Sequence, residues 1–187
     1  MKLGSGPARS SLHTLNVAFH RAMWDRRAIS RAPQYLFQCG LATLVLLVVL
    51  IVEDAVLNAA VMVAVASTAF IVFVIPNSIA ATPRRVIGGH IVAVLIGGLL
   101  TIILHSSFVD PIVAGNRIIF DVMAALSLGL SILLMVVTNT EHPPAAGTAL
   151  GLILEGFSWN LVLFVLLSAL LMSLIRIALR KRMTNLL

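Results

Sequence analysis

The sequence predicts an all-α polytopic membrane protein, with about six membrane-crossing helices, one of them short and broken by proline, preceded by an interfacial amphipathic helix. Hydrophobic residues make up 60 % of the 187 positions and charged residues only 11 %, against about 45–50 % and about 25 % in soluble domains. Several apolar runs also approach the roughly 20 residues of a spanning helix. A soluble domain of this size cannot bury so much apolar surface.

Each predicted crossing follows one apolar run. Four runs have about the required length, at residues 35–52, 57–75, 86–104 and 118–137. A last apolar stretch, residues 144–179, is interrupted by the sequence EGFSWN. We interpret it as a short crossing that ends near Phe157 and a full crossing that begins near Trp159. The lone cysteine, Cys39, excludes a disulfide framework.

The positive charges indicate how these helices are oriented. With six crossings, 12 of the 13 Lys and Arg residues fall on one face and only Arg117 falls on the other. Basic residues concentrate on the cytoplasmic side of membrane proteins, so we expect both termini in the cytoplasm, in a bacterial inner membrane. The net charge of +6 therefore reflects topology, and we expect no nucleic-acid partner.

The chain divides into three parts. Residues 1–33 are predicted to form a cytoplasmic tail and an interfacial helix, because apolar residues such as Leu15 and Phe19 recur at helical spacing opposite arginines. That segment has no apolar core of a signal peptide. Residues 34–182 form the transmembrane domain, and residues 183–187 form a C-terminal tail.

Two polar, proline-containing breaks interrupt the apolar pattern, and they resemble each other. One reads IPNSIAATPRR at residues 75–85, and the other reads VTNTEHPP at residues 137–144. Each ends an apolar helix at an Asn beside a hydroxyl residue, and each then uses Pro to start a new helix. We interpret the pair as an internal repeat, with Thr82 and His142 as equivalent helix N-caps.

The second break is predicted to lie deeper than the first. A helix from Pro144 to Phe157 rises only about 20 Å, which is short of the roughly 30 Å hydrocarbon core. Residues 138–144 are therefore expected to dip into the protein and to aim a helix N-terminus at a buried site. Such N-termini bind anions, and broken helices around a central site are typical of transporters.

The second break and its surroundings resemble the HPP family of integral membrane proteins, named for a His-Pro-Pro motif. The resemblance rests on TNTEHPPAAGTAL at residues 138–150, together with Pro76-Asn77-Ser78, Pro83-Arg84 and Gly88-Gly89-His90. It covers roughly residues 35–180. It implies about four spanning helices, fewer than the six counted here, and a transport role, since plastid members are associated with nitrite movement.

We therefore predict a transporter or channel for a small inorganic anion, with nitrite suggested by the resemblance. Arg84 and Arg85 would attract the anion, and the two breaks would replace part of its hydration shell. Glu141 is expected to pair with one of these arginines. The predicted substrate-binding residues are Asn77, Ser78, Thr82, Arg84, His90, Asn139, Thr140, His142, Pro143, Pro144 and Thr148.

Other interpretations remain open. The same residues can serve structure alone, with His142 and the two Asn residues as helix caps and the arginines as topology signals. The chain would then be a membrane scaffold or sensor subunit. An intramembrane metal enzyme would need His90, His142 and Glu141 at one point. No phosphate loop, His-Glu-x-x-His or nucleophile elbow is present, so we expect no catalysis, metal or cofactor. We expect a homo-oligomer, because six helices leave little room for a central path.

Overall fold

The computed structural model describes residues 31–52, 59–114 and 116–186, so the predicted interfacial helix lies almost entirely outside the described residues. The described part is helical and contains no strand. Its long elements are α2 (Ala32–Val52), α3 (Ala59–Val74), α4 (Pro83–Leu104), α6 (Arg117–Thr138), α7 (Pro143–Glu155) and α8 (Trp159–Leu179). Of three short elements, η1 (Ile79–Ala81) lies between α3 and α4, α5 (Asp110–Ala114) lies between α4 and α6, and η2 (Arg180–Arg182) follows α8.

The all-α class is confirmed for the described residues, whereas the count of six crossings stays a prediction. Four helices are long and apolar enough to cross a bilayer, in α2, α4, α6 and α8. The apolar part of α3, Ala60–Val74, is shorter, and α7 has only 13 residues. At 1.5 Å per residue, α7 is about 20 Å long, so it does not span the roughly 30 Å core by itself.

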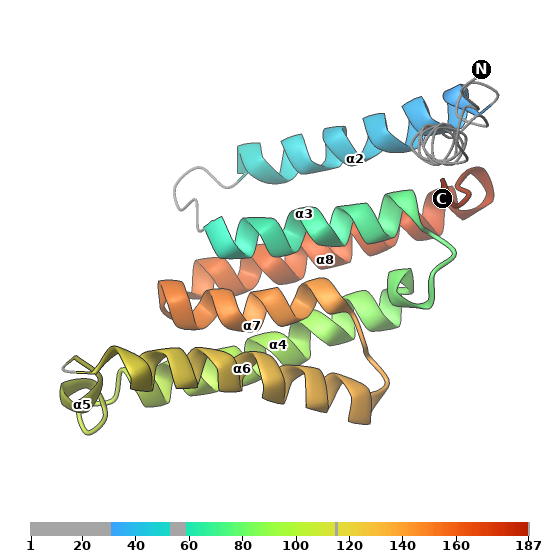
Figure 1. Ribbon diagram of the computed structural model, residues 1–187. Coiled ribbons are helices and arrows are strands. Elements are labelled where there is room, and N and C mark those ends of the chain that lie inside the picture. Colours follow the sequence, from blue (N-terminus) through green and yellow to red (C-terminus); the bar gives the residue numbers. More distant parts are fainter. Residues whose placement is uncertain (1–30, 53–58, 115, 187) are drawn as a thin grey trace, which may run out of the picture.

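The short helix α7 lies in the middle of the bundle. Figure 1 shows it between α3 on one side and α4 and α6 on the other, with successive long helices running in alternate directions. Small residues allow this close packing. A Cβ added at Gly97 of α4 would lie 2.8 Å from the Cα of Ala149, and one added at Gly151 would lie 2.6 Å from Val61 of α3.

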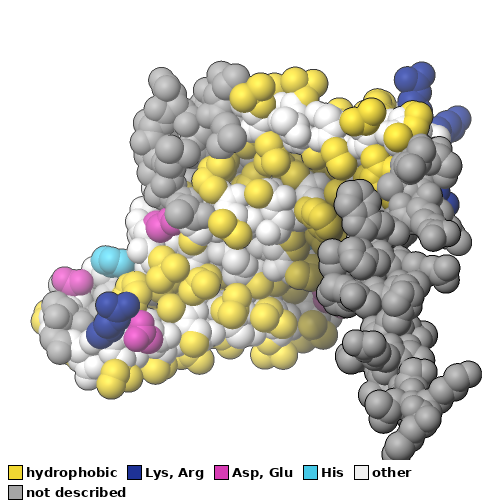
Figure 2. All heavy atoms as spheres, turned by 45° about the horizontal axis from the view of Figure 1, so that its top comes forward, with side chains coloured by type: hydrophobic (Ala, Val, Ile, Leu, Met, Phe, Trp, Pro, Cys, Tyr) yellow, Lys and Arg dark blue, Asp and Glu magenta, His cyan; other side chains and the backbone are white. Residues whose placement is uncertain are grey.

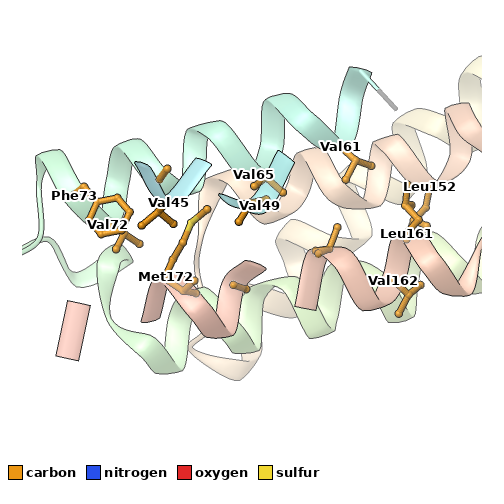
Figure 3. Close-up of a cluster of buried hydrophobic side chains, with 14 of the residues drawn as sticks. Val45, Val49, Val61, Val65, Val72, Phe73, Leu152, Leu161, Val162 and Met172 are labelled. Atoms are coloured by element: carbon orange, nitrogen blue, oxygen red, sulfur yellow. The ribbon is translucent and has the colours of Figure 1, made fainter. Parts of the chain in front are cut away.

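Most of the remaining core joins α2, α3 and α8. Figure 3 shows Val45, Val65, Phe73 and Met172 pointing into this layer from three helices. The outer faces of the helices are also apolar, with Leu95 62 % exposed on α4 and Leu167 61 % exposed on α8. Figure 2 shows hydrophobic side chains spread over the middle of one face and charged ones toward its ends. Such a surface fits lipid rather than water.

The residues predicted to be a C-terminal tail, 183–186 in the described part, pack against the start of α2 and the end of α3. Tyr35 Oη donates to the carbonyl of Leu186 at 2.6 Å, and Gln38 Nε2 donates to the carbonyl of Thr184 at 2.8 Å. The N–H of Leu186 donates to the carbonyl of Val74 at 2.9 Å. These bonds place the C-terminal segment beside the α3–α4 connection.

Candidate functional site

The two proline-containing breaks meet in the structure. We call residues 75–82 the first connection, which joins α3 to α4, and residues 139–142 the second connection, which joins α6 to α7. His142 Nδ1 in the second connection lies 2.9 Å from the carbonyl oxygen of Ala80 in the first. Arg84 Nη2, just after the first connection, lies 3.3 Å from the carbonyl oxygen of Thr138.

The second connection reverses the chain within four residues. Asn139 caps α6 in the left-handed conformation, at φ 56° and ψ 46°. Asn tolerates this conformation better than most residues because its short polar side chain bonds locally. Thr140 then donates its N–H to the carbonyl of Met135 at 2.8 Å, and His142 becomes the N-cap of α7. The chain therefore returns directly into the bundle.

The start of α7 offers few backbone donors to an anion. Pro143 and Pro144 have no N–H group, so two of the usual free donors of a helix N-terminus are missing. The next N–H, from Ala145, donates to the carbonyl of His142 at 2.9 Å. Donors for a small anion at this point must therefore come from side chains.

Close approach of α4 to the second connection depends on two glycines. A Cβ added at Gly88 would lie 2.6 Å from Thr140 Cγ2. One added at Gly89 would lie 2.8 Å from the Cβ of His142. The Gly-Gly-His sequence of α4 thus brings the helix backbone against the second connection and places His90 next to His142.

A buried polar cluster lies behind the second connection, formed by Thr68 of α3, His90 of α4, His142 and Thr148 of α7. Thr68 Oγ1 lies 3.0 Å from His90 Nε2 and 3.1 Å from His142 Nε2. His90 Nδ1 lies 3.0 Å from Thr148 Oγ1. All four side chains are essentially inaccessible, and the two imidazole centroids are 5.4 Å apart.

Thr68 is the member of this cluster that sequence reasoning missed. It lies in a helix whose other residues gave no reason to single out one hydroxyl. Its place becomes clear only from the packing, because Thr68 is one turn from Ala64, and Ala64 packs against Gly147 of α7. A hydroxyl on the face that meets α7 points at the His-Pro-Pro segment.

A charged rim lies beside the cluster. Arg85 Nη1 forms an ion pair with Glu141 Oε2 at 2.7 Å, which confirms that Glu141 pairs with one of the two arginines. A second guanidinium nitrogen of Arg85 donates to Asn139 Oδ1 at 2.5 Å. Arg84 is exposed, and its bond to the Thr138 carbonyl is long. Arg85 is thus held by the second connection, whereas Arg84 faces outward.

The remaining predicted residues bond elsewhere. Asn77 donates its backbone N–H to Asn185 Oδ1 at 2.9 Å. Ser78 Oγ accepts from the N–H of Ala80 at 3.2 Å, and Thr82 Oγ1 donates to the carbonyl of Ile79 at 2.8 Å. Pro143 and Pro144 line an outward-facing groove of about 620 Å³ against Val63, Ser67 and Phe70 of α3. The structure therefore groups the second-connection residues with His90 and Thr148, and it leaves the side chains of the first connection apart.

No group of three His, Cys, Asp or Glu side chains within residues 31–52, 59–114 and 116–186 is arranged to hold a metal ion. Glu141 belongs to the rim, where it pairs with Arg85, and the two histidines bond to threonine hydroxyls.

Comparison with known proteins identifies the family of the chain and one partial relative. The model of the HPP family, transmembrane region, matches residues 28–185. A transmembrane protein of Dictyostelium discoideum is 36 % identical over 85 residues, which is 46 % of this chain and 27 % of that protein. The match thus spans about a quarter of that relative's length, and its name gives no substrate. No solved structure matches the chain. The chain belongs to the HPP family of transmembrane proteins.

Proposed function

We propose that this chain transports a small inorganic anion across the membrane, and that nitrite is the first substrate to test. The observation that carries the proposal is the cluster of Thr68, His90, His142 and Thr148, buried where the two connections meet. Ionisable groups inside a membrane bundle are costly and usually serve function. The resemblance to the HPP family, whose plastid members are associated with nitrite movement, also favours transport.

In the proposed mechanism the rim attracts the anion and the cluster passes it on. Arg84 is exposed and weakly bonded, so its charge raises the local anion concentration at the entrance. Asn139 accepts a hydrogen bond from Arg85 and so positions this second guanidinium beside the entrance. Hydroxyl and imidazole donors then replace water around the anion one at a time, which permits both entry and release. We include a homo-oligomer in the proposal because α7 fills the centre of the bundle.

The test is anion flux into proteoliposomes that contain the purified full chain. Nitrite, nitrate and formate are compared with empty vesicles, and the proposal predicts nitrite entry well above that background. His142→Ala and Asn139→Ala lower the flux at equal amounts of folded protein. Gly129→Ala is the matched control, because nothing lies within 4 Å of the added Cβ. Nitrite flux no greater than that of empty vesicles would reject the proposal.

A specific observation favours a second candidate, a non-transporting scaffold or sensor subunit. Both ring nitrogens of His90 and of His142 already have partners within the protein. A purely structural cluster has the same property. The flux assay separates the two candidates, because a scaffold gives no flux with any of the three anions.

We further propose that the chain lies in a bacterial inner membrane with its termini in the cytoplasm, and that it is not an enzyme. The last turn of α8 and η2 carry Arg176, Arg180, Lys181 and Arg182, at the end of the bundle that holds both connections. Phe108, between α4 and α6, is 83 % exposed. A Phe108→Cys variant that also carries Cys39→Ser should react with an impermeant maleimide only from outside. Labelling from the cytoplasmic side alone would show that the orientation is the reverse of the one proposed.

A further inference from the structure

The polar cluster contains a hydroxyl with three partners and a single hydrogen to donate. Thr68 Oγ1 lies within hydrogen-bond distance of His90 Nε2, His142 Nε2 and, at 3.0 Å, the carbonyl oxygen of Ala64. A threonine hydroxyl has one hydrogen to donate and two lone pairs to accept with. The direction of that single hydrogen therefore determines the protonation of both rings.

The partners fix one arrangement for the neutral site. The Ala80 carbonyl can only accept, so His142 Nδ1 carries a hydrogen and donates to it. A neutral His142 then needs a donor at Nε2, which Thr68 supplies. Thr68 in turn accepts from His90 Nε2–H, and Thr148 donates its hydroxyl to His90 Nδ1. Every polar atom of the chain Thr148–His90–Thr68–His142–Ala80 is satisfied.

One added proton is accommodated without breaking this network. If His142 takes a proton at Nε2, that nitrogen donates to Thr68 Oγ1 while Nδ1 still donates to Ala80. The Thr68 hydroxyl turns its hydrogen to the Ala64 carbonyl, which is already 3.0 Å away, and accepts from both imidazoles. A second proton, on His90, would place two cations with ring centroids 5.4 Å apart and would require Thr148 to accept from His90 Nδ1 instead of donating to it.

We propose that His90, Thr68 and His142 form a binding site for a single proton, with the Thr68 hydroxyl as its switch, and that this proton travels with the anion. The coupling part rests on the proposed anion transport. The imidazolium forms by taking a proton from water and returns it to water as the anion leaves, so no covalent bond to the anion is made. A buried charge is costly unless it is paired, which links proton uptake to anion entry.

The other ionisable groups of the surrounding elements do not lie where they could hold this proton. The described residues of α3, Ala59–Val74, contain no ionisable side chain. On α4 the ionisable groups are Arg84, Arg85 and His90, and the rim around the second connection adds Glu141, which pairs with Arg85. Glu155 is at the opposite end of α7, and Arg117 and Asp121 of α6 pair at the opposite end of that helix. His142 and His90 are thus the groups able to hold the proton at the cluster.

The proton site is tested without any transport by ¹⁵N imidazole spectra of the full chain in lipid nanodiscs. Replacement of His13, His20 and His105 by Gln leaves only the pair. The expected spectra show Nδ1–H His142 and Nε2–H His90 at high pH, and a single imidazolium, at His142, on acidification. The opposite tautomers, two imidazoliums formed in parallel, or no imidazolium before the protein unfolds would each overturn the proposal.

The coupling is tested in proteoliposomes with a pH-sensitive dye inside. One proton should enter with each nitrite above the background of empty vesicles. Thr68→Ser keeps a hydroxyl and should keep this ratio, whereas Thr68→Val removes the switch and should abolish the coupled proton entry. Thr101→Val is the matched control, since Thr101 Oγ1 is another buried hydroxyl, bonded to the carbonyls of Gly97 and Leu152. Nitrite entry without protons in the wild type would overturn the coupling while leaving anion transport intact, and no nitrite entry would reject transport while leaving the spectroscopic test of the proton site.

Discussion

The first and second connections share a sequence pattern but differ in what their polar groups reach. In the first connection Asn77 bonds to Asn185 of the C-terminal segment, and the carbonyl of Pro76 accepts two bonds from the Arg176 guanidinium, at 3.0 and 2.6 Å. In the second connection His142 turns inward to the buried cluster. The same Asn–hydroxyl–Pro pattern therefore anchors the chain end in one place and builds a polar core in the other.

The difference follows from what each connection precedes. The first leads into α4, a helix of 22 residues that is long enough to cross a bilayer. The second leads into α7, whose 13 residues lie among α3, α4 and α6. A helix that starts inside the bundle brings its N-cap side chain inside with it. A helix that starts at the end of the bundle leaves its cap at the surface.

The largest expected effect comes from substitutions at the N-cap positions of α4 and α7, which are Thr82 and His142. His142→Ala removes a fully buried imidazole and should lower the free energy of unfolding by about 2–5 kcal/mol, as for other large buried side chains. Thr82→Ala removes only the bond to Ile79 and should cost less than about 1 kcal/mol. Unfolding of both variants by SDS titration in mixed micelles measures the two values. Equal losses would show that the caps play the same part.

The next largest effect is expected from the two glycines of α4, Gly88 and Gly89, that allow the second connection to approach closely. Gly89→Ala would place a Cβ 2.8 Å from His142 Cβ and 3.0 Å from the Thr140 carbonyl oxygen. Such overpacking costs about 1–3 kcal/mol. Gly129→Ala has open space and should stabilise α6 by up to about 1 kcal/mol through helix propensity. Thermal unfolding of the two variants should therefore shift in opposite directions, and a shift of Gly89→Ala upward would contradict the close approach.

A smaller effect isolates the first connection. Asn185→Ala removes the acceptor of the Asn77 N–H and should cost about 0.5–1.5 kcal/mol. Amide hydrogen exchange should become faster at Asn77 and Leu186 but stay unchanged at Ala145, at the start of α7. Faster exchange at Ala145 as well would mean that the two connections are not independent in this respect.

The smallest effect is expected from the rim. Glu141→Gln breaks a partly exposed ion pair with Arg85 and should cost about 0.2–1 kcal/mol, less at high salt. Asp121→Asn breaks the far more exposed pair with Arg117, at 3.9 Å, and serves as the control with no measurable change. Stability measured at low and high salt gives both values. If the loss of stability in Glu141→Gln is the same at high salt, the ion pair is not its cause.

The sequence was sufficient for the class of fold and for the second connection, but not for the cluster. Apolar runs located the long helices, and proline with Asn located both breaks, because these signals act within a few residues. The cluster joins Thr68, His90 and His142 from separate elements, so it depends on how α3, α4 and α7 pack. The N-terminus of α7 was interpreted as an anion site with free backbone donors, although the two prolines that begin it have no N–H group. The fold of the C-terminal segment rests on Gln38 and Tyr35, which lie far away in sequence.

The most direct test of the account is whether α4 and the second connection touch within the membrane. Thr140 Cβ lies 3.2 Å from the Cβ that Gly88 would gain, close to the roughly 3.5–4.5 Å of a disulfide, and Thr140→Cys removes the methyl group that Gly88→Cys alone would strike. The variant Gly88→Cys, Thr140→Cys and Cys39→Ser is given a protease site in the segment before α5, oxidised in membranes and cleaved. We predict that the two fragments stay joined until a reductant is added. Fragments that separate without reductant would contradict the contact between α4 and the second connection.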